Sequence, residues 1–193
     1  MTLHLVHAEN VPPQAWKNRG GSTRELLAWP SVADWVMRIS VARIDADGPF
    51  SVYPEVQRWF AVIDGAGVAL SFVDGVRRLK PGDPPLCFDG ASTVICRLLG
   101  GATNDLNLML RRGQGAMRPV WPGIAWDEAF EVRALYATVA GRWSADGERR
   151  EVPAHALLWS SAASTAPWRY QPDDARAAPL GYWLGYTPEG MLR

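Results

Sequence analysis

Hydrophobic and polar residues alternate between Asn104 and Arg111. Side chains of an extended strand point alternately to its two faces, so Leu106, Leu108 and Leu110 share one face of this segment. The opposite face is mostly polar and carries Asp105, Asn107, Met109 and Arg111. Such a polar face usually turns to bulk water, but it also suits a barrel whose polar interior holds a small ligand. The pattern predicts a strand and leaves both settings open.

A second alternating segment runs from Trp35 to Ile44, with Ile39 and Val41 on one face. Its other face carries Arg38, Ser40 and Ala42. Further short apolar segments follow, separated by turns rich in glycine, proline and aspartate at 47–49, 65–67, 74–75, 80–83 and 89–90. Long helical periodicity is nearly absent. This succession of short strands predicts an all-β sandwich or small barrel.

The same scheme of strand and turn occurs twice along the chain. A first half ends at about residue 115, and a second half covers about residues 124–162 after a segment rich in glycine and proline. In residues 163–193, prolines are interspersed among tryptophans and tyrosines. We expect this stretch to be an irregular tail whose aromatic side chains pack on the body. The length fits one domain over residues 1–193, built of two barrel-like halves.

Charge and composition narrow the cellular setting. The 193 residues include 20 lysine and arginine residues and 20 aspartate and glutamate residues, so no excess charge recruits nucleic acid or an anionic membrane. The chain shows neither a leader sequence nor an apolar run long enough to span a bilayer. Cys87 and Cys96 each lie in an apolar run, which indicates buried thiols rather than a disulfide. We expect a soluble cytoplasmic protein.

Several segments, taken together and in order, resemble the HutD/Ves family. They are Trp16-Lys17-Asn18 to Thr23-Arg24-Glu25, Arg38-Ile39-Ser40, Asp47-Gly48-Pro49-Phe50-Ser51, Arg58, Asp64-Gly65, and Asp105-Leu106-Asn107 through Arg111-Arg112. The resemblance implies a HutD-type bicupin-like domain with a cupin-like (RmlC-like) jelly-roll β-barrel fold. It also implies an association with bacterial histidine utilisation, but no known reaction. Arg19, Met37, Glu55 and Gln57 depart from the residues usual in the family, so an identical ligand does not follow.

Ten residues are candidates for a ligand-binding site, because they fall on the polar strand faces or on the glycine-containing loop before them. They are Trp16, Asn18, Thr23, Glu25, Arg38, Ser40, Ser51, Arg58, Asn107 and Arg111. Guanidinium groups bind carboxylates through paired hydrogen bonds, and hydroxyl and amide groups fix the remaining oxygens. These residues predict a pocket for a small carboxylic acid. Alternatively, Arg38 pairs with Glu25 or Asp105 and only rigidifies the barrel.

The chain lacks the usual patterns of metal and nucleophile sites. A metal-dependent cupin enzyme needs several converging histidine and glutamate ligands. Only His4, His7 and His155 are present, and the first two lie at the terminus. Neither Ser51 nor Cys96 has a histidine nearby in sequence to act as its base. We therefore predict no catalytic residue, no metal and no cofactor.

Three functions remain open. The preferred one is a non-catalytic carboxylate-binding protein that senses or buffers an intermediate of histidine degradation, such as N-formylglutamate or urocanate. The sensing role follows from the resemblance alone. The alternative is a metal-free cupin-type isomerase or epimerase, for which Glu25 or Asp105 would be the general base. The third is an assembly protein whose aromatic tail docks a partner. A homodimer is compatible with the sequence, in which no feature decides it.

Overall fold

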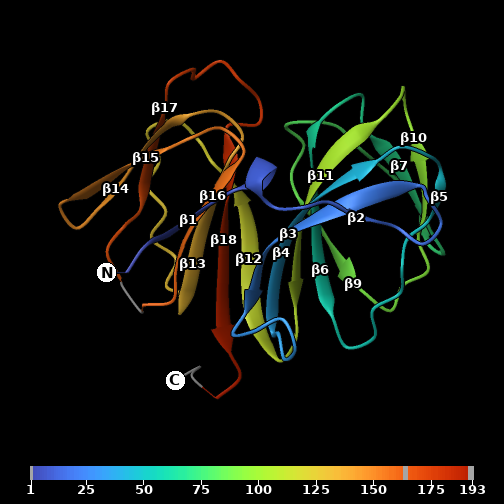
Figure 1. The fold of residues 1–193 in the computed structure, drawn as a ribbon, viewed down its shortest axis with the longest axis horizontal. Helices are drawn as coiled ribbons and strands as arrows, with labels where there is room; N and C mark the ends of the chain where they lie inside the picture. The colour runs from blue at the N-terminus through green and yellow to red at the C-terminus, as the bar shows by residue number, and fades with distance from the viewer. Residues whose placement is uncertain (1, 163–164, 191–193) are drawn as a thin grey trace. The chain divides into compact units, whose positions relative to one another are not determined.

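The computed structural model describes residues 2–162 and 165–190, which form two compact units (Figure 1). Unit 1 consists of Met1–Val11 and Gly113–Arg193, and unit 2 of Pro12–Arg112. In the described residues, regular structure consists of antiparallel strands and one short 3-10 helix, η1 (Ala8–Asn10). No helix in this part of the chain is long and apolar enough to cross a membrane. The all-β class predicted from the sequence is therefore confirmed.

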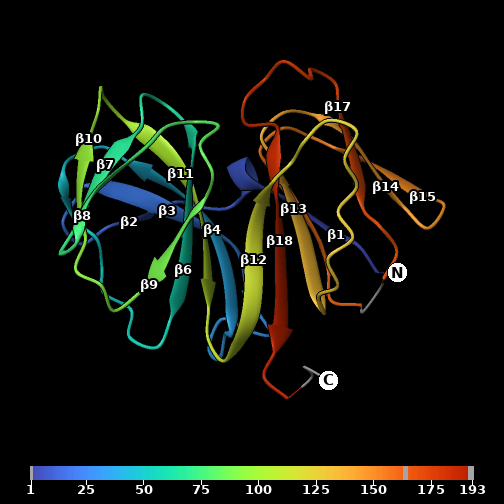
Figure 2. The same ribbon diagram turned by 180° about the vertical axis from the view of Figure 1, so that it is seen from behind.

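Unit 2 contains two sheets (Figures 1 and 2). The larger has the order β2 (Gln14–Ala15), β3 (Gly21–Trp29), β4 (Met37–Ile44), β11 (Thr103–Leu110), β6 (Gln57–Asp64) and β9 (Leu86–Asp89). The smaller has the order β5 (Gly48–Pro49), β10 (Ile95–Leu98), β7 (Val68–Phe72) and β8 (Gly75–Leu79). Buried side chains of both sheets, among them Phe60, Val62, Val68 and Leu70, form one hydrophobic core. The strands are thus divided between two packed sheets rather than closed into one continuous barrel.

Strand β11 lies in the middle of the larger sheet, between β4 and β6. Asn107 lies opposite Ser40 of β4 and Phe60 of β6, and Met109 lies opposite Arg38 and Arg58. Leu106, Leu108 and Leu110 are buried on one face, as predicted. Asp105, Asn107 and Met109 on the other face are only 1%, 5% and 5% exposed. The polar face of β11 is therefore enclosed by protein and does not turn to bulk water.

The loop before β3 is tight, as its two glycines predicted. The backbone nitrogen of Trp16 donates to the carbonyl of Gly21 at 2.9 Å, and Arg19 has a positive φ of 58°. A Cβ atom at Gly21 would lie 2.1 Å from the carbonyl oxygen of Arg43 and 3.0 Å from the ring of Trp16. Only glycine permits this close approach, which holds the Trp16 indole beside the start of β3.

Unit 1 also contains two sheets. The five-stranded sheet has the order β1 (His4–His7), β16 (Ala156–Ser160), β13 (Val132–Ala137), β18 (Gly181–Pro188) and β12 (Gly113–Pro119). The three-stranded sheet has the order β15 (Glu148–Val152), β14 (Gly141–Ala145) and β17 (Arg169–Pro172). A cluster of buried aromatic side chains fills the core, and it includes Trp126, Trp143, Trp168 and Trp183. The N-terminal strand β1 belongs to this unit, although the sequence placed it in the first half.

The expectation of an irregular tail beyond residue 162 is wrong for the described residues 165–190. β18 pairs with both β12 and β13, and Tyr182, Trp183, Leu184 and Tyr186 within it are buried. Pro172 and Pro188 only end strands β17 and β18, a position that a strand tolerates. Aromatic residues favour strands, so the composition taken as irregular builds a central strand instead. The predicted tail residues 163–164 and 191–193 lie outside the described residues.

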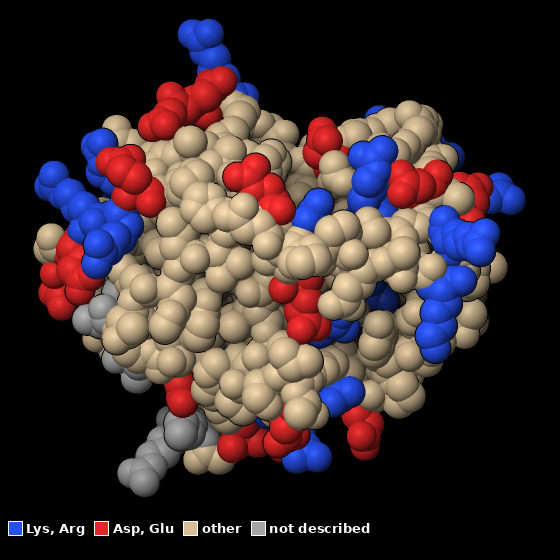
Figure 3. All heavy atoms as spheres, in the orientation of Figure 1, with Lys and Arg blue, Asp and Glu red and all other residues tan. Residues whose placement is uncertain are grey.

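The third function, in which an exposed aromatic tail docks a partner, does not fit these side chains. Trp168, Tyr170, Tyr182, Trp183 and Tyr186 are at most 3% exposed. Trp168, Tyr170 and Trp183 belong to the aromatic core of unit 1, and all five rings are buried and so not available on the surface. On the face of the molecule shown in Figure 3, basic and acidic side chains are interspersed rather than gathered by sign, as the balanced composition suggests.

Candidate functional site

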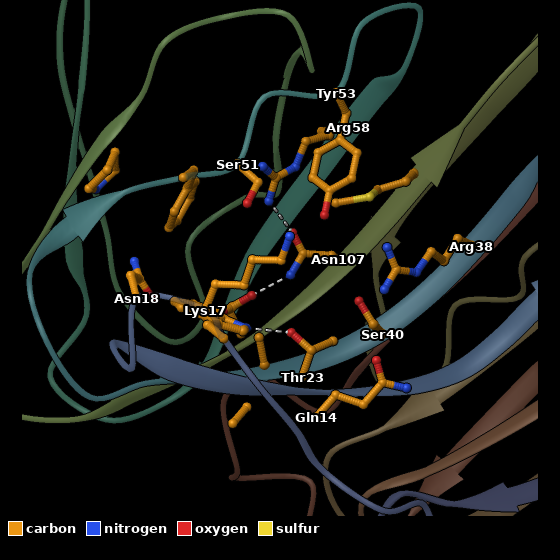
Figure 4. A pocket seen from close by; sticks show the side chains of 17 residues that line it. Gln14, Lys17, Asn18, Thr23, Arg38, Ser40, Ser51, Tyr53, Arg58 and Asn107 are labelled. Carbon is orange, nitrogen blue, oxygen red and sulfur yellow. Dashed lines mark hydrogen bonds between the residues drawn. The ribbon is translucent and has the colours of Figure 1, made fainter.

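Unit 2 contains a cavity of about 610 Å³, a volume typical of sites for small molecules (Figure 4). Its lining comes from the polar face of the larger sheet, from residues 14–18 and from residues 49–53. The lining residues are Gln14, Ala15, Trp16, Lys17, Asn18, Thr23, Arg38, Ser40, Ala42, Pro49, Phe50, Ser51, Tyr53, Arg58, Asp105, Asn107 and Met109. The polar face of β11, with Asp105, Asn107 and Met109, therefore forms part of the cavity wall.

Eight of the ten predicted site residues line the cavity, and Glu25 and Arg111 do not. The eight are Trp16, Asn18, Thr23, Arg38, Ser40, Ser51, Arg58 and Asn107. Glu25 lies beside it, with its Oε2 atom 2.6 Å from Nε of Arg38. The guanidinium carbon of Arg111 lies 4.0 Å from the centroid of the Trp35 ring. Strand β11 ends at Leu110, so Arg111 no longer follows the alternation that predicted its direction.

Three of the predicted residues in the cavity lining make hydrogen bonds within the protein. The indole Nε1 of Trp16 donates to Oγ1 of Thr23 at 2.8 Å, and Oδ1 of Asn18 accepts from the backbone nitrogen of Gly20 at 3.0 Å. The first bond ties Trp16 to strand β3, and the second stabilises the turn within residues 18–20. The ring of Trp16 is thereby held as one wall of the cavity.

Asn107 joins two charged groups of the lining. Its Oδ1 atom accepts a hydrogen bond from Nη2 of Arg58 at 2.8 Å, and its Nδ2 atom donates to Oδ1 of Asp105 at 2.5 Å (Figure 4). A guanidinium group only donates and a carboxylate only accepts, so these neighbours determine which way round the amide lies. Figure 4 also shows the polar ends of Arg38, Ser40 and Arg58 directed towards the region around Asn107.

Arg58 is 6% exposed and is surrounded by aromatic rings. Its guanidinium carbon lies 5.1 Å from the ring centroid of Phe50, 5.2 Å from that of Phe88 and 5.8 Å from that of Tyr53. Burial lowers the pKa of Arg58, while the nearby Asp105 acts in the opposite direction. An arginine starts from a pKa so high that it stays charged in proteins, and the rings stabilise that charge.

Asp105 is a buried carboxyl group with an incomplete set of hydrogen bonds. It is 1% exposed, and its Oδ2 atom has no hydrogen-bond partner. Burial raises the pKa of Asp105 from 3.8 to about 7, although the charge of Arg58 and the hydrogen bond from Asn107 oppose this rise. Desolvation disfavours the charged form of an acid, so burial prevails here. Near neutral pH, Asp105 is therefore divided between its neutral and charged forms.

Replacing Asp105 with asparagine is expected to make the protein less sensitive to high pH. A folded-state pKa raised above the unfolded value means that the native carboxyl group favours the proton, so stability falls as the pH rises through about 7. A shift of this size corresponds to at most about 4 kcal/mol of unfolding free energy. In urea unfolding at pH 5 and pH 9, we expect Asp105→Asn to lose less stability than the wild type. Equal losses in both proteins would contradict this assignment.

Sequence reasoning did not include several lining residues among the candidates, most notably Phe50, Tyr53 and Lys17. Phe50 and Tyr53 belong to a short segment between β5 and β6 that has no hydrophobic periodicity. The sequence therefore did not predict where their side chains point. Asp105 was considered only as a partner of Arg38 or as a general base. The alternation did place Asp105 on the same face as Asn107, but it did not show that the carboxyl group would be buried at a cavity.

The described residues contain no group of three or more histidine, cysteine, aspartate and glutamate side chains that could hold a metal ion. The three histidines belong to unit 1, whereas the cavity lies in unit 2. His4 stacks on Trp159 with ring centroids 4.3 Å apart, and Nδ1 of His155 lies 3.4 Å from the hydroxyl of Tyr136. These contacts account for two of the histidines as packing residues.

Comparison with known proteins gives one family match and several similar sequences. The family model described as HutD matches residues 8–176. A protein of Pseudomonas putida, named for its position in the hutC 3' region, is 37% identical over 123 residues, which are 62% of this chain and 64% of that protein. Protein Ves of Cronobacter sakazakii is 33% identical over 111 residues, 57% of this chain and 61% of that protein. The chain thus spans less than two thirds of the length of these relatives.

Solved structures agree with the fold over almost the whole chain. HutD from Pseudomonas fluorescens superposes with a TM-score of 0.84 and 24% identity, covering 98% of this chain and 100% of that one. Oxalate decarboxylase of Bacillus subtilis, a cupin-fold protein, gives a TM-score of 0.58 at 12% identity, covering 95% of this chain and 77% of that one. These similarities confirm the predicted cupin-like fold.

Proposed function

This chain belongs to the HutD family, which is associated with histidine utilisation, and from that premise we propose that unit 2 binds a small carboxylate without changing it chemically. The observation that carries the proposal is the pair of guanidinium groups, Arg38 and Arg58, at one cavity. Lys17 adds a third cationic group, whereas Asp105 is the one carboxyl group among the lining residues. Even with Glu25 paired to Arg38, the positive charges are in excess, so the cavity favours an anion.

An intermediate of histidine degradation, such as N-formylglutamate or urocanate, suits this cavity. The cavity volume of about 610 Å³ accommodates either molecule, and Trp16, Phe50 and Tyr53 provide walls for its carbon skeleton. The hydroxyl groups of Thr23, Ser40 and Ser51 are partners for the remaining oxygens. Binding without reaction would let the protein sense or buffer the intermediate.

Calorimetric titration with histidine, urocanate, formiminoglutamate, N-formylglutamate and glutamate tests the proposal. We expect saturable binding of at least one acid and a 10- to 100-fold weaker affinity in Arg38→Ala, since a charge-assisted hydrogen bond contributes roughly 1.5–3 kcal/mol. Arg43→Ala is the matched control, because Arg43 is an exposed arginine of the same strand and pairs with Asp45. If none of the five acids binds the folded wild type, the proposal is wrong for this ligand class.

One observation favours a metal-free isomerase or epimerase as a second candidate. Asp105 faces the cavity with a pKa raised by burial to about 7, and a general base works best when its pKa lies near the working pH. Glu25, the other candidate base, is held by Arg38. Proton NMR of each acid after incubation with the protein in D₂O separates the two functions. Deuterium incorporation or a changed spectrum indicates catalysis, and a recovered, unlabelled acid indicates binding alone.

The cytoplasmic location and the homodimer remain predictions from the sequence. So do the absence of nucleic-acid and membrane partners and of any cofactor. Light scattering of the purified protein, with and without the acid that binds, would determine the oligomeric state.

A further inference from the structure

The Oδ2 atom of Asp105 is an unsatisfied hydrogen-bonding group at the proposed carboxylate site. It is buried, it belongs to a residue that lines the cavity, and no hydrogen bond satisfies it. Buried polar atoms are nearly always hydrogen-bonded, so each exception calls for a physical explanation. Because Asp105 belongs to the cavity lining, a ligand bound there would supply this missing partner.

Several charged and titratable groups line the cavity or interact with Asp105. They are Arg58, which the amide of Asn107 links to Asp105, Arg38 with its partner Glu25, Lys17 and Tyr53 in the lining, and Cys96 of β10. Burial, with Asp105 and Asp47 adding to its effect, raises the pKa of Cys96 to about 12, so this thiol stays neutral. Arg58 is the cation linked to Asp105 through Asn107.

Asn107 determines where a proton on Asp105 would be. Its amide nitrogen donates to Oδ1, because its amide oxygen is already turned to Arg58. An NH₂ group cannot accept a hydrogen bond, so the proton of neutral Asp105 belongs on Oδ2. The neutral carboxyl group therefore carries an O–H donor that has no acceptor, whereas the charged form leaves a buried anionic oxygen without a donor.

On the basis of the proposed function, we propose that Asp105 is a specificity-determining residue. Asp105 in its neutral form binds the anionic ligand, so that the ligand and one proton are taken up together. The proton comes from solvent and stays on Oδ2, which donates to a carboxylate or carbonyl oxygen of the ligand. A second anion beside Arg58 would repel charged Asp105, because two like charges in one buried site disfavour joint ionisation. A ligand carboxylate thus binds and protonates Asp105 at once.

This arrangement selects ligands by the group that they turn to Asp105. An oxygen acceptor, as in a carboxylate, formyl or amide group, receives the Oδ2 proton. An ammonium group cannot accept it and would require the charged form of Asp105, so it would bind without proton uptake. The protonation state of Asp105 therefore determines which ligand group binds beside it. Neutral Asp105 binds a hydrogen-bond acceptor, and charged Asp105 binds a donor.

The test measures affinity and proton uptake together. Wild-type protein is titrated with N-formylglutamate and with glutarate, two acids that have no group titrating near neutral pH, at pH 6, 7, 8 and 9. Triethanolamine and Tris buffers, which are cationic and do not compete for an anion site, are compared at pH 8, because their different ionisation heats report the number of protons taken up. Asp105 is half ionised near pH 7. Above pH 7, we therefore expect the affinity to weaken about tenfold for each pH unit, and the number of protons taken up per bound ligand to approach one.

Two variants decide whether Asp105 is the group. Asp105→Asn replaces the O–H donor with an N–H donor, and we expect binding that no longer depends on pH and is about 100-fold tighter than wild type at pH 9. Asp64→Asn removes the same charge from an exposed position at the end of β6 and should behave as wild type. If Asp105→Asn does not fold, the proton count of the wild type still decides.

The outcomes separate the inference from the proposed function. Acid binding that stays constant from pH 6 to pH 9 without proton uptake overturns the inference and leaves the proposed function standing. A pH slope that persists unchanged in Asp105→Asn also overturns it, because another group would then carry the proton. Absence of binding of any acid at any pH removes both.

Discussion

Removing residues 168–193 is expected to unfold unit 1. This segment contains β17 and β18, and β18 is the strand that joins β12 to β13 in the five-stranded sheet. Its five buried aromatic side chains contribute roughly 1.5–3 kcal/mol each through burial. Their sum is comparable to the whole stability of a typical domain, about 5–15 kcal/mol.

Near-ultraviolet circular dichroism and thermal unfolding are the measurements that check this expectation. The truncated protein should lose the aromatic signal of the tryptophan core and its cooperative transition. Arg169→Ala is the control, because Arg169 lies in the removed segment but is exposed, and this variant should keep both. A truncated protein with the spectrum and transition of the full chain would contradict this expectation and show that residues 168–193 are dispensable for the fold.

Replacing Arg58 with methionine is expected to abolish carboxylate binding and to destabilise unit 2. Methionine retains the length and the apolar contacts of the side chain but removes the charge that faces Asn107 and the three rings. Loss of one partner from a buried charged network costs about 3–5 kcal/mol, because the other charge is left uncompensated. Here that charge is Asp105, whose pKa is held down by Arg58 and should rise further without it.

The effect should therefore depend on pH and on Asp105. In urea unfolding, we expect Arg58→Met to be more destabilising at pH 8 than at pH 5, where Asp105 is protonated in either protein. Adding Asp105→Asn should recover part of the loss at pH 8, a coupling that a double-mutant cycle measures. Arg97→Met, at an exposed position of β10, is the matched control. Equal destabilisation at both pH values would contradict the proposed coupling of Arg58 to Asp105.

Alternation along single strands was sufficient to predict much of the site. Asp105, Asn107 and Met109 share a face of β11, and Arg38 and Ser40 share a face of β4, as the letters indicate. Because β4 and β11 are neighbours, these two faces form one continuous lining. The period of two of a strand is a local property, so it is readable without knowing the fold.

Alternation did not predict the structure correctly in two places. One is the end of strand β11, and the other is strand β18, which is buried on both faces. Arg111 lies one residue beyond β11 and turns to Trp35, although the pattern placed it with Asn107. In residues 181–188, buried aromatic residues occupy both faces, so no alternation marks them as the central strand β18. A strand that is buried on both faces loses the pattern by which a half-buried one is recognised.

The sequence by itself determined the all-β class, the tight loop at Gly20 and Gly21, the polar faces of β4 and β11, and the family resemblance. These depend on backbone geometry and on residues that are close in the chain. Only the tertiary structure decided that Tyr53 and Phe50 meet Arg58, that β18 completes unit 1, and that Asp105 is buried with one oxygen unpartnered. Burial and charge interactions depend on distances between segments far apart in sequence, and these distances exist only in the folded chain.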